Sequence, residues 1–242
     1  MSEARLSDEL YRSTVCRMME SHGARLFQLV VTVAAGIRHA PGAAWLRFAG
    51  GQVRELTALY AQLAALYESV AGAPLDPRAH GADHAPPDGP TSWPEALAAQ
   101  LVAGRQCRWQ LHEHDLCSYA PYREFVARAV AELDARHALI EAALDDVTRD
   151  PASASALHQA LEPWMRWAVE AFGRPNTPGM AYAINVGLRR RDASATVHGF
   201  VEDLRAVARS HGVTLPPRWS PPPESASLVA ALSGIARAHE NA

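Results

Sequence analysis

The chain has 242 residues, with 23 arginines and no lysine against 26 acidic residues, and a formal net charge of -3. Hydrophobic residues make up 48% of the sequence and charged residues 20%, which excludes an intrinsically disordered chain. The near-neutral charge argues against nucleic-acid binding, and the lack of lysine excludes Schiff-base and Walker-type lysine chemistry.

The cysteines and the apolar segments predict a soluble cytoplasmic protein that does not associate with a membrane. Cys16, Cys107 and Cys117 are widely spaced and contain no C-x-x-C pair, so neither a disulfide framework nor a cysteine zinc site is expected. The first twenty residues carry too many charges for a signal peptide. The most apolar run, 26–37, is too short to cross a bilayer.

Helical periodicity dominates the sequence, and no alternating strand pattern is convincing. Ser7 is the expected N-cap of the first helix, and Ser92 and Glu95 form the expected capping box of the third. We predict helices over about 7–37, 43–71, 92–113, 122–148, 154–172, 194–211 and 224–240, with a polar surface loop at 72–91 and a turn at 173–179. Four long helices in a row predict an all-α antiparallel bundle. The whole chain, 1–242, is interpreted as one domain with a C-terminal extension at 216–242.

Asp134 and His137 are the first candidates for a functional site. They lie three residues apart on the fourth predicted helix and share a face with its apolar stripe. A carboxylate and an imidazole that point into a bundle core are costly unless they are paired or bind a metal ion. The alternative is a salt-bridged cluster at the boundary of the core.

A di-iron site in a bundle needs about six ligands, and the other helices supply few of them. His22 on the first helix and Glu55 on the second are the remaining candidates, so the predicted metal ligands are His22, Glu55, Asp134 and His137. For His22 the competing interpretation is a core histidine with its hydrogen bonds satisfied. Iron is possible as a cofactor, but this ligand set is incomplete.

Three further motifs have simpler interpretations. The stretch 112–115, His-Glu-His-Asp, is expected to be a solvated helix end, because residues i and i+2 of a helix point apart. The arginines at 189–191 either meet a phosphate or an acidic partner or form a charged helix boundary. His80 and His84 lie in the polar loop and carry little weight as metal ligands.

Three segments in sequence resemble the catalytic subunit of bacterial phenylacetyl-CoA epoxidase. The first is Leu116-Cys-Ser-Tyr-Ala-Pro-Tyr122 followed by Asp134-Ala-Arg-His137. The second is Glu162-Pro-Trp-Met-Arg-Trp167 through Phe172-Gly-Arg-Pro175. The third, the most specific, is Gly187-Leu-Arg-Arg-Arg191, Phe200-Val-Glu-Asp203 and His211-Gly-Val-Thr-Leu-Pro216.

The resemblance implies a ferritin-like four-helix bundle with additional C-terminal helices, related to phenylacetic acid catabolism. In that family the active subunit oxidises an aromatic acyl-CoA at a di-iron centre, and an iron-free subunit of the same fold supports it. Of the six ligand positions, Asp134 and His137 keep a suitable group, and Glu55 does so if the alignment slips by one residue. The first-helix ligand falls near Arg25 or Leu26, and the third-helix ligand falls near Ala103 or Gly104.

Two functions remain open. The first is a non-oxygenating scaffold or partner subunit that holds another protein, or forms a homo-oligomer, or presents an acyl-CoA or aromatic molecule. The second is a repurposed oxidoreductase with one metal or none, in which Asp134 or His137 acts as the acid or base. The directions of Arg25 and Arg105 distinguish them. If both arginines point inward, they fill the former metal cavity and pair with Asp134.

Overall fold

The computed structural model describes residues 5–78 and 86–219. Within these residues it contains α-helices and one short 3-10 helix and no strand, so the all-α prediction is confirmed. The elements are α2 (Glu9–Gly36), η1 (Ile37–His39), α3 (Ala43–Ala71), α4 (Trp93–His112), α5 (Ala120–Thr148), α6 (Pro151–Glu170), α7 (Pro178–Asn185) and α8 (Ala193–Ser210). The predicted C-terminal helix at 224–240, His80 and His84 lie outside the described residues.

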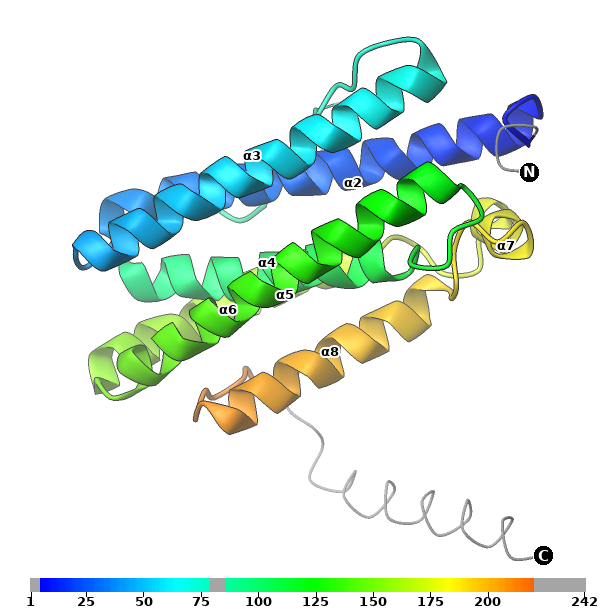
Figure 1. Cartoon of the computed structure of the whole chain (residues 1–242). Coiled ribbons are helices and arrows are strands. Elements are labelled where there is room, and N and C mark those ends of the chain that lie inside the picture. The colour runs from blue at the N-terminus through cyan, green and yellow to red at the C-terminus, as the bar shows by residue number, and fades with distance from the viewer. Residues whose placement is uncertain (1–4, 79–85, 220–242) are drawn as a thin grey trace, which may run out of the picture.

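The long helices form a bundle of two antiparallel hairpins, α2 with α3 and α4 with α5 (Figure 1). Helix α2 also packs against α4, whereas α3 and α5 touch less closely. Helices α3 and α4 run in the same direction (Figure 1). Helix α6 packs on α4 and α5, and α8 lies against α4 on the outer side of the bundle.

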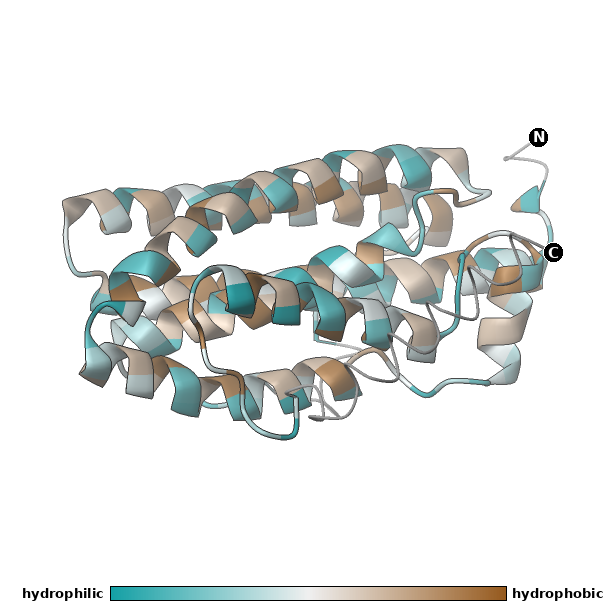
Figure 2. Cartoon of the chain, turned by 90° about the horizontal axis from the view of Figure 1, so that it is seen from below, coloured by the Kyte–Doolittle hydropathy of each residue, from teal (hydrophilic) through white to brown (hydrophobic). Residues whose placement is uncertain are grey.

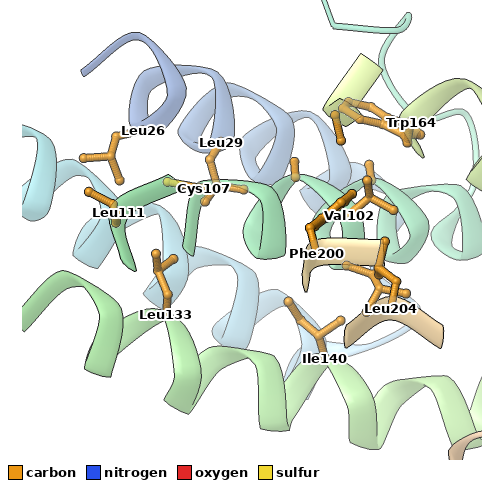
Figure 3. Close-up of a cluster of buried hydrophobic side chains, with 14 of the residues drawn as sticks. Leu26, Leu29, Val102, Cys107, Leu111, Leu133, Ile140, Trp164, Phe200 and Leu204 are labelled. Carbon is orange, nitrogen blue, oxygen red and sulfur yellow. The ribbon is translucent and has the colours of Figure 1, made fainter. Parts of the chain in front are cut away.

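Helix α4 is the centre of the molecule. It contacts α2, α5, α6 and α8, and every residue from 96 to 107 is buried. Figure 3 shows side chains from several helices gathered around it: Leu26 and Leu29 from α2, Leu133 and Ile140 from α5, Trp164 from α6, and Phe200 and Leu204 from α8. Because α4 is surrounded, its polar residues Gln100, Arg105, Gln106 and Gln110 are buried as well.

The other long helices carry hydrophilic and hydrophobic residues on different faces, as Figure 2 shows. In α3, for example, the fully buried positions form a stripe with helical spacing: Ala49, Gln52, Leu56, Leu59 and Leu63. In the described part of the chain, no helix combines the length and the apolar character that a membrane span requires.

The helix starts follow local side-chain chemistry. Asp8, rather than Ser7, caps α2, because its carboxylate accepts hydrogen bonds from the amides of Leu10 and Tyr11 at 2.9 and 3.2 Å. Ser92 accepts from the amide of Glu95 as predicted, but Glu95 reaches back to Thr91 instead of Ser92. The hydrogen bonds from the backbone and side chain of Thr91 lower the pKa of Glu95.

Two connections differ from the prediction. The described part of the 72–91 loop is mostly exposed, but Leu75 is buried against Gly23 of α2, where an added Cβ would stand 2.6 Å from the leucine side chain. The predicted turn after Gly173 continues into α7, which Thr177 caps by accepting from the amide of Met180. Its Pro- and Gly-rich start concealed this eight-residue helix.

Candidate functional site

Asp134 and His137 lie side by side on α5, at the edge of the core. His137 is buried, whereas the side chain of Asp134 is about half exposed, and 3.9 Å separates the imidazole Nδ1 from the carboxylate. Asp134 also receives hydrogen bonds from Nε and Nη2 of Arg108 on α4, at 2.9 and 3.4 Å. The Nε2 of His137 faces Gly104, where an added Cβ would stand 3.0 Å away. Asp134 and His137 are therefore neighbours as predicted, but the carboxylate of Asp134 is already paired with Arg108.

The electrostatic surroundings of His137 keep its imidazole neutral. Burial lowers the pKa of His137 to about 3, and the positive charges of Arg105 and Arg108 act in the same direction. A general acid or base works best when its pKa lies near the working pH. In this state of the protein, His137 is therefore poorly suited to proton transfer at neutral pH.

Glu55, the third candidate, points outward from α3. Its carboxylate accepts a hydrogen bond of 2.6 Å from Nη2 of Arg136, a buried arginine on α5 that also donates to the carbonyl of Gln52. Arg136 is the second of the two residues that separate Asp134 from His137 in the sequence. Glu55 is thus part of an ion pair between α3 and α5, and half of its side-chain surface remains exposed.

Arg25 and Arg105 both point into the bundle, and both are buried. Arg105 pairs with Glu141 of α5 and has Asp203 of α8 at 3.7 Å. Arg25 donates to Gln28 at 2.8 Å and lies over the ring of Trp167, 5.6 Å from its centroid. The inward alternative for these two arginines is therefore the one that the structure contains. The pairing with Asp134 that this alternative implied is wrong, since Arg108 pairs with that carboxylate and Arg105 pairs with Glu141.

The space between α2, α3, α4 and α5 is nearly filled. A cavity of about 10 Å³ remains, lined by residues that include Gln52, Gln100, Gly104, Arg136 and His137. Neither side-chain atom of Gln100 has a hydrogen-bond partner among the described residues, and the same holds for Nε2 of Gln52. This volume corresponds to about one water molecule, so the centre of the bundle has no room for an aromatic substrate.

An open cleft of about 520 Å³ lies on the outer side of His137, between α4, α5 and α8. Asp134, Glu141, Asp203 and Trp109 line it, and the indole of Trp109 donates to Asp203 at 2.9 Å. His137 thus separates the surface cleft from the small inner cavity, since it lines both. This cleft is where a small molecule could reach the predicted pair.

The wall of this cleft depends on Gly199. A Cβ added to Gly199 would lie 2.5 Å from two ring atoms of Trp109, and the ring is held by Asp203 and stacked by Arg108. We expect Gly199→Ala to lower the free energy of unfolding by about 1–3 kcal/mol, because overpacking outweighs the gain in helix propensity. Urea unfolding measures this change. Gly51→Ala, where a Cβ meets nothing within 4 Å, is the matched control and should raise stability by about 0.5–1 kcal/mol. Equal effects in both variants would contradict the expected clash.

His22, the fourth candidate, belongs to a different cluster. Its Nδ1 forms a short hydrogen bond with the hydroxyl of Tyr122, and its ring packs edge-on against His114 with 4.8 Å between centroids. The Nδ1 of His114 is 2.6 Å from the carbonyl of Leu188. Burial lowers the pKa of His22 well below its usual value and that of His114 to about 3. The interpretation of His22 as a core histidine with a hydrogen-bond partner fits this environment.

The stretch 112–115 was predicted to be a solvated helix end, and this was wrong for its middle residues. Glu113 and His114 are buried, with exposures of 0% and 4%. Glu113 pairs with Arg191 at 2.7 Å, and Asp115 pairs with Arg190 at 2.7 Å. The charged boundary interpretation of 189–191 therefore holds for two of its arginines. The complementary charges of the two stretches are the sequence signal for this pairing.

The residues present do not fit the di-iron centre that the resemblance implies. Glu55 and Asp134 are each paired with an arginine, and His22 and His137 line separate cavities. Across residues 5–78 and 86–219, no three side chains of His, Cys, Asp or Glu are grouped so that they could hold a metal ion. Two irons need more donors than this arrangement brings together.

Comparison of the sequence with protein-family models and with curated proteins finds no match.

Proposed function

We propose that this chain is a non-oxygenating scaffold or partner subunit, related to the ferritin-like phenylacetyl-CoA epoxidases. The observation that carries the proposal is Arg105. It is 2% exposed and pairs with Glu141 beside the position where the resemblance places metal ligands. A buried guanidinium there neutralises the carboxylates that would otherwise bind iron and repels a metal cation.

The other arginines support the same function. Arg136 forms an ion pair with Glu55, and Arg108 forms one with Asp134. Each predicted acidic ligand therefore has a cationic partner of its own. A subunit that only has to hold its shape and bind another protein can fill its interior in this way. The ferritin-like class of the bundle is part of the same proposal, since the order of the two helix hairpins agrees with it.

A repurposed enzyme is the second candidate, and the cleft favours it. Asp134 and His137 both line this cleft of about 520 Å³, which lies within the size range of small-molecule sites. In this alternative, an aromatic or acyl substrate would bind outside the bundle centre.

Elemental analysis after growth with added iron tests both functions. For a scaffold we expect no stoichiometric metal in the wild-type protein and no change in Asp134→Ala or His137→Ala. Two irons per chain that are lost in both variants would overturn the scaffold proposal. About one metal ion per chain, lost in the same variants, would favour the repurposed enzyme.

A further inference from the structure

A second cavity, of about 240 Å³, opens between the N-terminal half of α2 and α7, where these elements lie together at one end of the molecule (Figure 1). His22, His114, Arg17 and Arg189 line it, together with the first turn of α7. None of the described residues lining it is a carboxylate. The predicted functional pair on α5 takes no part in it.

Two arginines give this cavity a positive potential. Arg189 donates from Nε to the carbonyl of Arg191 and from Nη2 to Thr196, and its Nη1 has no hydrogen-bond partner among the described residues. Among the described residues neither Arg189 nor Arg17 is paired with a carboxylate. The charges of Glu113 and Asp192 reach Arg189 and partly offset the lowering of its pKa by burial. The start of α7, at Thr177 and Gly179, adds the positive end of a helix dipole. These features favour an anion.

The two histidines add hydrogen-bonding groups to the cavity, and these make it more selective than its positive charge alone would. A carbonyl oxygen only accepts, so Nδ1 of His114 must donate to Leu188, and the neutral ring then presents a bare lone pair at Nε2. Nε2 makes no hydrogen bond with any described residue, although His114 is 4% exposed. The site therefore offers a hydrogen-bond acceptor beside two cations.

In His22, unlike in His114, Nε2 is a hydrogen-bond donor. Tyr122 is completely buried, and its only hydrogen-bond partner among the described residues is Nδ1 of His22. The phenol hydrogen is satisfied when it is donated to that nitrogen, so the neutral ring carries its own hydrogen at Nε2. His22 then supplies a donor to the cavity, and in this tautomer Nε2 has no lone pair for a metal ion.

We propose that this cavity binds a small oxyanion that also carries a hydroxyl group, such as hydrogen phosphate or a short hydroxy acid. Arg17, Arg189, the donor on His22 and the start of α7 bind the anionic oxygens, and the lone pair of His114 accepts from the hydroxyl. The proposal is independent of the scaffold function, because it uses neither Asp134 nor His137 and requires no partner protein.

Calorimetric titration of the full chain at pH 7 and constant ionic strength tests the proposal with two matched pairs of probes. Hydrogen phosphate and glycolate carry a hydroxyl, whereas sulfate and acetate do not. We expect saturable binding of phosphate or glycolate and about tenfold weaker binding of the matched anion, since its oxygen would face the lone pair of His114. Which pair binds identifies a phosphate or a hydroxy acid as the ligand.

The variants assign the binding to the cavity. Arg17→Gln removes an exposed cation without a partner and should weaken binding several-fold, and Arg189→Gln should weaken it about tenfold. His114→Leu should remove the preference for the hydroxyl. Arg47→Gln, which changes an exposed arginine near the start of α3, is the matched control and should bind like the wild type. Lack of saturable binding of all four probes, equal binding within both pairs, or binding that neither Arg17→Gln nor Arg189→Gln weakens would overturn the proposal.

Discussion

Lowering the pH from 7 to 5 is expected to remove about 4 kcal/mol of folding free energy from this protein, about 2 kcal/mol for each of the buried histidines His114 and His137. His22, His114 and His137 are all buried, and burial lowers the pKa of each of them. For His114 and His137 the folded value is about 3. In the unfolded chain an imidazole has a pKa near 6.5.

The direction of the effect follows from proton uptake. Between pH 6.5 and about 3 the unfolded chain binds protons at His114 and His137 and the folded chain does not, so stability falls as the pH falls. The lowered pKa of His22 acts in the same direction. The contribution is fully present above about pH 6.5. Because small proteins have about 5–15 kcal/mol of stability, this loss is a large part of the total.

Urea unfolding at pH 7, 6 and 5 measures this slope in the wild type and in His137→Gln. Between pH 7 and pH 5 the variant should lose about 2 kcal/mol less than the wild type, since one of the buried imidazoles is gone. A stability that does not change between pH 7 and pH 5 would contradict the neutral, buried state of these rings.

Removing the counter-charge of Arg105 is the second change with a large expected effect. Glu141→Gln leaves the guanidinium buried, with 3% of its side chain exposed and, among the described residues, Asp203 as the remaining carboxylate at 3.7 Å. We expect the free energy of unfolding to fall by about 3 kcal/mol, as is typical when one partner of a buried pair is lost.

Replacing Arg105 instead of Glu141 should lower the free energy of unfolding much less. Arg105→Met leaves Glu141 and Asp203, whose side chains are 29% and 33% exposed and can be hydrated. It also removes two guanidinium nitrogens, Nε and Nη1, that have no hydrogen bond among the described residues. A change within about 1 kcal/mol is therefore expected.

Equilibrium unfolding of both single variants and of the double variant measures this asymmetry. The double variant should recover most of the stability that Glu141→Gln loses. Glu124→Gln, at an exposed position of α5, is the control and should change stability by less than about 0.5 kcal/mol. Equal losses for Arg105→Met and Glu141→Gln would mean that the arginine is required as strongly as its partner.

The periodicity of apolar residues predicted the long helices well, and α3 has the predicted bounds. The differences at helix starts are local. Asp8 replaces Ser7 as a cap because both residue types serve that role, and the sequence does not rank two neighbours. Helix α7 was missed because Pro and Gly are usually read as turn residues.

The candidate site was predicted in part. The spacing of Asp134 and His137 places them on one side of α5, where the structure brings them within 3.9 Å. The partner of Asp134 was not predictable, because Arg105 and Arg108 are almost one turn apart on α4 and both were possible. The catalytic role of Asp134 and His137 stays a prediction, as do the single domain and the cytoplasmic location.

The sequence by itself determined that the chain is helical and where its long helices lie, because helix formation depends on side chains three and four residues apart and on caps. Only the tertiary structure decided how the charges are used. Glu113 and Arg191 are 78 residues apart in the chain, and His22 and Tyr122 are 100 apart. Whether such groups are paired, neutral or open to a ligand depends on burial and distance, and packing around α4 sets both.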